Sequence, residues 1–136
     1  MPSTLKLLIV TPLGPMFSED VAIVTLPSVT GQIGIYPDHV PLITQIIPGE
    51  IIVEQGGRER FLAVGGGLVD ITSSHVSILT DMAVAAENID EAKAEEARQR
   101  AAARLAEKLS EEEVASVNAA LVRSLAQLQV KRRRRR

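Results

Sequence analysis

The sequence has 136 residues, of which 46% are hydrophobic, so it is long enough for one ordinary domain with a buried core and a small appendage. It contains no cysteine, which excludes disulfides, thiolate nucleophiles and cysteine-based zinc sites, and its 2% aromatic content leaves few stacking platforms for bases or sugars. The formal net charge of −2 hides an acidic body and a basic end, because residues 131–136 hold 6 of the 15 lysines and arginines. The remaining residues carry 9 basic and 17 acidic side chains, a balance of −8.

Short runs of alternating hydrophobic residues, broken by Gly, Pro, Ser and Asp, occupy residues 5–84. This period of two, with frequent turn residues and no long helix between the runs, predicts an antiparallel β-sandwich or flattened barrel rather than a parallel sheet. The clearest hairpin is at residues 55–58, where paired glycines suit a tight turn between two hydrophobic runs. The predicted strands are residues 5–10, 21–26, 32–35, 42–47, 51–55, 59–64, 68–71 and 76–79, with room for one or two more.

Three consecutive glycines, Gly65, Gly66 and Gly67, raise the question of a phosphate-binding loop. The Lys-Ser or Lys-Thr pair of such a loop is missing, and the residues that follow predict a strand rather than the helix whose N-terminus would bind the anion. We therefore expect these glycines to allow close approach between backbone segments. The two histidines, His39 and His75, lie in separate turns, and we assign neither as a metal ligand.

After the predicted strands, Gly and Pro disappear and Ala, Glu, Leu and Arg predominate, which predicts helices at residues 91–109 and 111–130. Asp90 is placed to cap the first helix, and Ser110 with Glu113 has the pattern of a capping box at the second. So short a connection predicts an antiparallel hairpin. We therefore expect an α+β protein with an N-terminal antiparallel β-sandwich domain (1–86), a C-terminal two-helix hairpin (87–130) and a basic tail (131–136).

No group of side chains has the pattern of a nucleophile, a base and an orienting residue, so we expect no enzyme activity, no catalytic residues and no metal site. No run approaches the ~20 hydrophobic residues of a membrane-spanning helix, and the first residues lack the pattern of a signal peptide. On composition alone, the basic tail suits nucleic acid, an anionic lipid surface or an acidic protein surface. A stand-alone nucleic-acid-binding β-domain that uses this tail is the alternative function, although the acidic body and scarce aromatic residues count against it.

Several motifs occur in order along the chain: TGQIGIYPDHVPL at residues 30–42, Gly49, AVGGGLV at residues 63–69, and the pair Ile89 and Asp90 before the predicted helices. Together they resemble the ε subunit of F-type ATP synthases of the bacterial and chloroplast type. The resemblance implies a non-catalytic subunit of the central stalk, or rotor, of a proton-translocating complex that makes ATP. Its sandwich would couple the γ subunit to the ring of c subunits, and its C-terminal helices would inhibit ATP hydrolysis.

The resemblance also implies where the protein and its partners are found. The expected location is peripheral, on the cytoplasmic face of the bacterial inner membrane or the stromal face of the thylakoid, within the ATP synthase. No nucleic acid is then expected as a partner. Tyr36, Asp38 and His39 would lie near the c-ring, although the prolines on either side of His39 equally suit a rigid turn in which this histidine binds the backbone.

The resemblance gives the basic tail a partner as well. When the hairpin opens, the second helix would rise along γ and bring Lys131, Arg132, Arg133 and the arginines after them to an acidic segment of the catalytic β subunits. A ~20-residue helix spans ~30 Å, which is enough for such a displacement. A static hairpin packed on the sandwich is an equally good interpretation of this part of the sequence.

The stretch IDEAKA that begins at Ile89 resembles the nucleotide-binding pattern of the same family, I/L-D-x-x-R-A. The resemblance assigns Ile89, Asp90, Lys93 and Ala94 to a nucleotide site, with Arg123 from the second helix. Lys93 stands where the pattern has arginine, and an ammonium group lacks the planar fork that binds two phosphate oxygens at once. We therefore expect no cofactor, and ATP at most as a weakly bound regulatory ligand. Without a nucleotide, Asp90 would cap the helix and Lys93 would be a solvated charge.

Overall fold

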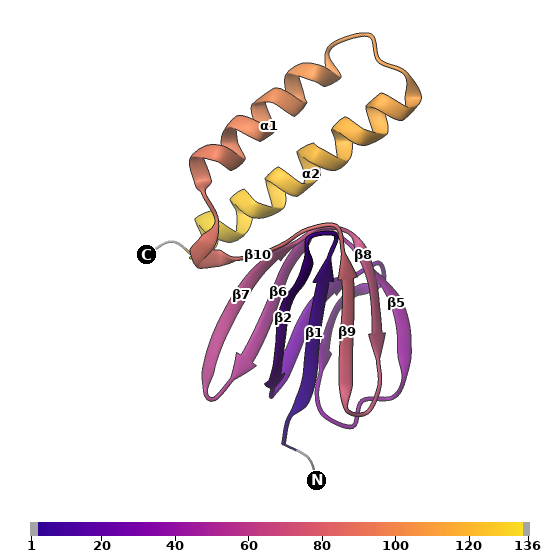
Figure 1. The fold of residues 1–136 in the computed structure, drawn as a ribbon, viewed down its shortest axis with the longest axis vertical. Helices are drawn as coiled ribbons and strands as arrows, with labels where there is room; N and C mark the ends of the chain where they lie inside the picture. The colour runs from indigo at the N-terminus through magenta and orange to yellow at the C-terminus, as the bar shows by residue number, and fades with distance from the viewer. Residues whose placement is uncertain (1–2, 135–136) are drawn as a thin grey trace.

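The computed structural model describes residues 3–134. Ten strands are followed by a short 3-10 turn (Ala86–Asn88) and two helices, so the expected fold class, an antiparallel sandwich with a C-terminal helical hairpin, is confirmed (Figure 1). The strands are β1 (Leu5–Thr11), β2 (Gly14–Val21), β3 (Ile23–Ser28), β4 (Gly31–Ile35), β5 (Leu42–Ile46), β6 (Gly49–Gln55), β7 (Arg58–Val64), β8 (Gly67–Ile71), β9 (His75–Thr80) and β10 (Ala83–Ala85), and the helices are α1 (Glu91–Leu105) and α2 (Glu111–Arg134).

The strands form one sheet that folds over on itself into two layers (Figure 1). Their order is β10-β7-β6-β3-β5-β8-β9-β1-β2, and β4 also pairs with β3. The pairs are antiparallel except β1 with β9, which run parallel. Side chains join β2, at one end of this order, to β6 and β7 near the other: Gln55 donates to the Asp20 carbonyl oxygen (3.0 Å), and Arg60 pairs with Glu19 (3.1 Å). The sheet is therefore close to a closed barrel.

The interior of the sandwich is almost entirely aliphatic. Along β1, Leu5, Leu7 and Ile9 are buried and alternate with half-buried residues, which is the period of two that the sequence shows. Each such aliphatic side chain contributes ~1.5–3 kcal/mol when it is fully buried. The other strands supply inward residues at the same spacing, among them Val21, Val24, Leu26, Ile35, Ile46, Ile51, Val53, Val69, Ile71, Val76 and Ile78.

Two strands lie outside the eight ranges assigned from periodicity. β2 buries only Phe17 and Val21, because it is an edge strand whose polar residues face water, and so the hydrophobic alternation is weak. β10 has three residues, too few to establish any period. The sequence pattern allowed one or two strands beyond the eight, and β2 and β10 are these two strands.

Of the three consecutive glycines, Gly67 is required by the close approach of two backbone segments, as predicted. A Cβ atom at Gly67 would overlap the carbonyl group of Leu79, and one at Gly65 would overlap the carboxylate of Asp81. At Gly66, by contrast, the nearest atom to such a Cβ lies at an ordinary 3.8 Å. The glycine run therefore marks a place where the start of β8 and the end of β9 lie very close together.

The helices begin where predicted but end at different residues. The capping box at the start of α2 is formed, because the Glu113 N–H donates to Ser110 Oγ and the Ser110 N–H donates to Glu113 Oε1, both at 3.2 Å. α1 ends at Leu105, four residues before the expected end. α2 continues to Arg134, four residues beyond the expected end, because the cations in its last turn suit the helix dipole and meet acidic partners described below. The last two arginines of the expected tail lie outside the described residues.

The hairpin lies across one end of the sandwich, with α2 between α1 and the strands (Figure 1). A small hydrophobic cluster joins the two parts: Ala63, Ala86, Ile89 and Val130 are buried, and Phe61, Met82 and Val84 pack around them. The helices are therefore attached to the sandwich mainly through α2.

Within residues 3–134, no helix is long and apolar enough to cross a membrane.

Replacing Gly67 by Ala tests the packing of the glycine run. We expect Gly67→Ala to lower the free energy of unfolding by about 3 kcal/mol, because its Cβ would meet backbone that cannot move aside. The matched change Gly66→Ala, where space is ordinary, lowers it by less than ~1 kcal/mol. Urea unfolding followed by circular dichroism measures both, and equal losses would contradict the interpretation.

Candidate functional site

The junction between the sandwich and α1 is built from the predicted Ile89 and Asp90. Ile89 is only 4% exposed and belongs to the cluster that joins the two parts of the chain. Asp90 caps α1, since its Oδ1 accepts a hydrogen bond from the Lys93 backbone N–H (3.1 Å), as predicted. Ala94 is also buried. The junction thus fixes where the first helix begins.

The remaining residues of the expected nucleotide site are Lys93 on α1 and Arg123 on α2. The Lys93 side chain is exposed near the start of α1. Arg123 on α2 pairs with Asp81 of the sandwich (3.4 Å), and Gln127, one turn later, donates to the Met82 sulfur (2.9 Å). Arg123 is therefore engaged on the face of α2 that meets the sandwich, and it has a structural role that sequence reasoning missed.

The predicted partner-contact residues Tyr36, Asp38 and His39 lie in the loop between β4 and β5. Asp38 has a positive φ of 66°, and its N–H donates to the carbonyl oxygen of Ser73 in the turn between β8 and β9 (2.8 Å). That turn is at the end of the sandwich far from the helices (Figure 1). His39 Nδ1 donates to the Val40 carbonyl oxygen (2.6 Å), so the histidine binds the backbone, as the alternative interpretation expected.

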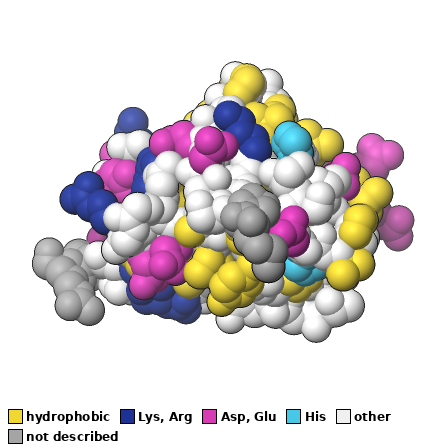
Figure 2. Space-filling model, turned by 90° about the horizontal axis from the view of Figure 1, so that it is seen from below, with side chains coloured by type: hydrophobic (Ala, Val, Ile, Leu, Met, Phe, Trp, Pro, Cys, Tyr) yellow, Lys and Arg dark blue, Asp and Glu magenta, His cyan; other side chains and the backbone are white. Residues whose placement is uncertain are grey.

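This end of the sandwich also exposes hydrophobic side chains. Figure 2 shows the molecule from below, where yellow hydrophobic groups lie among charged ones. Such a cluster on a protein surface is typical of a contact with another protein. In and beside the loop, the exposed residues are Tyr36 (60%), Val40 (75%), Leu42 (41%) and Ile43 (70%).

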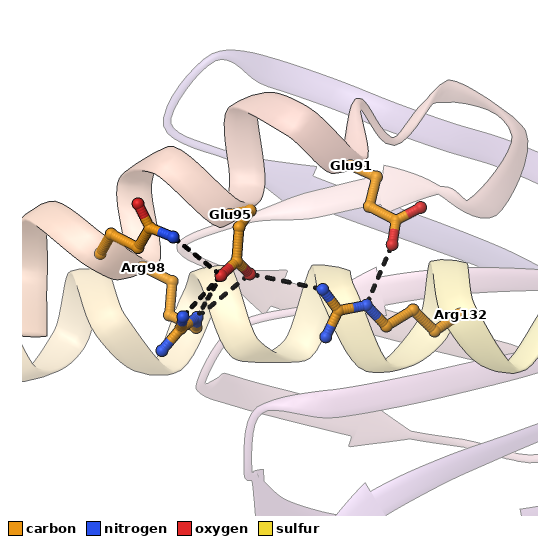
Figure 3. Close-up of polar contacts among 5 residues, drawn as sticks. Glu91, Glu95, Arg98 and Arg132 are labelled. Carbon is orange, nitrogen blue, oxygen red and sulfur yellow. Dashed lines mark hydrogen bonds and ion pairs between the residues drawn. The ribbon is translucent and has the colours of Figure 1, made fainter.

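At the opposite end, the basic residues of the expected tail are held by acids of α1. The Arg132 guanidinium pairs with Glu91 (2.9 Å) and with Glu95 (3.4 Å), as Figure 3 shows. The Glu95 carboxylate also accepts hydrogen bonds from Nε of Arg98 (3.1 Å) and from the side-chain amide of Gln99 (3.3 Å). One turn of α1 therefore presents two carboxylates to the last turn of α2.

A carboxylate of the sandwich holds the next two arginines. Glu50 on β6 is paired with Arg134 (2.7 Å) and Arg133 (3.3 Å), and its side chain is only 8% exposed. The Arg134 guanidinium also lies over the Phe61 ring, 3.8 Å from its centroid, in a cation–π contact. Lys131 Nζ donates to the Ala86 carbonyl oxygen (3.4 Å). The predicted contact residues Lys131, Arg132 and Arg133 are thus all bound within the chain.

The charges at this end shift the pKa values of three groups, and that of Arg98 is raised by its hydrogen bond with Glu95. The hydrogen bond from Arg98, strengthened by the charges of Arg98 and Arg132, lowers the pKa of Glu95 from 4.5 to about 2. The hydrogen bond with Glu50 raises the pKa of Arg134. The Glu95 shift thus arises mainly within α1, whereas the Arg134 shift arises from a contact between α2 and the sandwich.

The fold and this cluster of charges define a two-part protein, a β-sandwich that carries a helical hairpin held down by ion pairs. Two family models match it. The ATP synthase delta/epsilon chain β-sandwich domain matches residues 4–86, and the ATP synthase delta/epsilon chain long α-helix domain matches residues 87–132. The chain therefore belongs to the ATP synthase delta/epsilon chain family, as an epsilon subunit.

Relatives and solved structures agree with this assignment. The ATP synthase epsilon chain of Alkalilimnicola ehrlichii is 39% identical over 135 residues, which cover 98% of this chain and 96% of the relative. The epsilon chain of Desulforamulus reducens is 39% identical over 92% of this chain and 95% of its own. A chain in the cryo-EM structure of the Euglena gracilis mitochondrial ATP synthase, described as OSCP/F1/c-ring, has a TM-score of 0.75 and 26% identity, covering 95% of this chain and 81% of that one.

A more distant structure supports the fold alone. A chain of the Tetrahymena thermophila mitochondrial ATP synthase, from its central stalk and c-ring, has a TM-score of 0.57 at 10% identity and covers 93% of this chain and 96% of its own. An epsilon subunit is a stalk subunit of the synthase and not its catalytic subunit. The expected family and a central-stalk subunit are thus confirmed.

The Glu95 pKa provides a test of the charges around α1. Because its folded value, about 2, lies below the ordinary 4.5, ionised Glu95 stabilises the folded form of α1 above pH 4.5, mainly through Arg98 on the same helix, and this contribution is lost as the pH falls toward 2. We expect Arg98→Ala to move the Glu95 midpoint back toward 4.5, measured by NMR titration of the side-chain carboxyl. Arg100→Ala on the same helix is the control, and an unchanged midpoint in Arg98→Ala would show that the pair does not form.

Proposed function

We propose that this subunit works in the rotor of its ATP synthase, where the sandwich couples the γ subunit to the c-ring and the C-terminal helices restrain ATP hydrolysis. Membership of the family supports the first part. Further support comes from the end of the sandwich with Tyr36, Asp38 and His39, because its exposed hydrophobic side chains suit a protein partner. We assign this end to the c-ring.

The observation that carries the second part is the manner in which the hairpin is attached. Its interface with the sandwich includes one small hydrophobic cluster, two side-chain hydrogen bonds and several ion pairs, most of which are partly exposed to solvent. Such pairs contribute little individually, so that separating the hairpin from the sandwich has a modest cost. The interface thus suits an element with two arrangements, one folded and one extended.

The contact between the two helices is also modest. Small residues line it, and a pocket opens between Ala97 and Ala101 of α1 and Val117 and Ala120 of α2. Small side chains bury little apolar area, at roughly 25 cal/mol per Å². With 24 residues, α2 is ~36 Å long, so the extended arrangement brings its basic end far from the sandwich. There Lys131, Arg132 and Arg133 would meet an acidic segment of the catalytic β subunits.

This function places the subunit at the membrane through its complex, on the cytoplasmic face of a bacterial inner membrane or the stromal face of a thylakoid. The alternative, a nucleic-acid-binding domain, depended on a free basic segment. Arg132, Arg133 and Arg134 each have an acidic partner within the chain, so this alternative gains no support from the structure.

A cross-link that keeps the hairpin folded tests the proposed restraint. Gln32 on β4 and Gln129 on α2 line the same pocket, and the chain has no cysteine, so Gln32→Cys with Gln129→Cys can be joined selectively by a short bismaleimide. We expect hydrolysis by the assembled enzyme to rise, about fivefold for a restraint of ~1 kcal/mol. Each single variant treated with the reagent is the control. An unchanged rate after complete cross-linking would refute the restraint.

We further propose that ATP is a weak regulatory ligand of this chain at most, and that no other cofactor is used. The Asp90 carboxylate is occupied by the helix cap, and Arg123 is paired with Asp81. We expect isothermal titration with MgATP to give little or no heat at millimolar nucleotide. Lys93→Arg, which restores the planar fork of the family pattern, is the matched variant and is expected to bind more tightly. Tight binding by the natural chain would contradict this proposal.

A further inference from the structure

The last turn of α2 is bound by three carboxylates from two different parts of the fold. Glu50 belongs to β6, whereas Glu91 and Glu95 belong to the first two turns of α1. Together they hold Arg132, Arg133 and Arg134 at distances of 2.7–3.4 Å. One basic turn therefore fastens α2 to the sandwich and to α1 at the same time.

Glu50 is the central member of this cluster. Its side chain is 8% exposed and receives two hydrogen bonds from Arg134, at 2.7 and 3.0 Å, in the bidentate geometry that makes such pairs strong. Arg134 is 29% exposed and covers the Phe61 ring, so the pair is shielded from solvent more than the other ion pairs of the hairpin. A shielded bidentate pair contributes more than an exposed one.

We propose that Arg132, Arg133 and Arg134 with Glu50, Glu91 and Glu95 form a latch that holds the hairpin folded, and that the same arginines serve either this latch or an external acidic surface, never both. The inference deepens the proposed restraint of hydrolysis and rests on it for its functional consequence. While the latch is closed, the charges that would bind the catalytic subunits are already neutralised. When the hairpin opens, its arginines exchange the carboxylates of this chain for those of the external surface. The stability of the latch therefore determines how strongly the hairpin restrains ATP hydrolysis.

This shared use of the arginines separates two kinds of substitution. Removing the arginines weakens both the folded and the extended arrangement, and the net effect on hydrolysis is small or of either sign. Removing the Glu50 charge weakens only the folded arrangement, because Glu50 lies on the sandwich and remains behind when α2 leaves. Glu50→Gln, which keeps the shape of the side chain, therefore isolates the latch.

The opening of the hairpin can be measured directly in the full-length isolated subunit. Fluorophores on Ser18→Cys in β2 and Asn118→Cys in α2 report the distance between the sandwich and the helix, since both positions are exposed and the chain has no other cysteine. We expect Glu50→Gln to raise the ratio of open to folded hairpin about tenfold. In the chain with an unsubstituted latch, we expect the ratio of open to folded hairpin to rise when the salt concentration is raised from about 0.1 to about 1 M, because the Debye length falls from ~10 to ~3 Å.

Two controls distinguish the latch from a general loss of stability. Glu19→Gln removes a carboxylate from an exposed pair with Arg60 on the sandwich and is expected to leave the ratio unchanged. In an Arg134→Gln background, Glu50→Gln is expected to raise the ratio less than in the natural chain, because only the longer contact with Arg133 (3.3 Å) is then left to lose. A ratio unaffected by Glu50→Gln, or an equally large effect in the Arg134→Gln background, would overturn the latch.

The assembled enzyme provides the second readout. With the latch and the proposed restraint both present, Glu50→Gln lowers ATP hydrolysis by favouring the extended hairpin. If Glu50→Gln opens the isolated subunit but leaves hydrolysis unchanged, the latch stands and the restraint of hydrolysis is contradicted. If cross-linking the folded hairpin raises hydrolysis but Glu50→Gln does not open it, the restraint stands and the latch is refuted.

Discussion

The Glu50 carboxylate holds the end of the hairpin on the sandwich through ion pairs. It binds two arginines of the last turn of α2, and one of these also covers Phe61 beside the small cluster that contains Ile89 and Val130. α1 in turn packs on α2 and sends its own carboxylates to the same turn. The polar contacts at the C-terminal end of α2 thus add to those of Arg123 with Asp81 and of Gln127 with Met82, one to three turns earlier, in fixing the position of both helices. A subunit whose parts meet at so small a junction is suited to a change of arrangement.

Much of the fold followed from local chemistry in the sequence. Alternation of buried and half-buried residues in β1 and its neighbours predicted the sandwich, and the Asp90 cap and the Ser110 capping box predicted where the helices begin. These features depend only on residues close together in the chain. Where local signals were weak, as in β2 with its two buried residues, the strand could not be assigned. Short or one-sided patterns carry too little information about distant partners.

The same distinction explains what was missed at the candidate site. Residues 131–136 were predicted to form a basic tail because the partners of the arginines are far away in the sequence: Glu91 is 41 residues from Arg132, and Glu50 is 84 residues from Arg134. No spacing rule predicts such pairs. The i, i+4 spacing of Glu91 and Glu95 places two carboxylates on one face of α1 and carries no information about a distant partner. Their pairing with Arg132 depends on how α2 packs against α1.

The parallel pairing of β1 with β9 has a consequence for how the chain folds as it is made. Lys6 lies opposite His75, so one side of the first strand stays uncovered until most of the sandwich has been synthesised. Contacts so distant in sequence form late and slow the folding of a domain. A ribosome adds ~5–20 residues per second, so β1 would wait several seconds with the backbone groups of one edge unpaired before β9 is made.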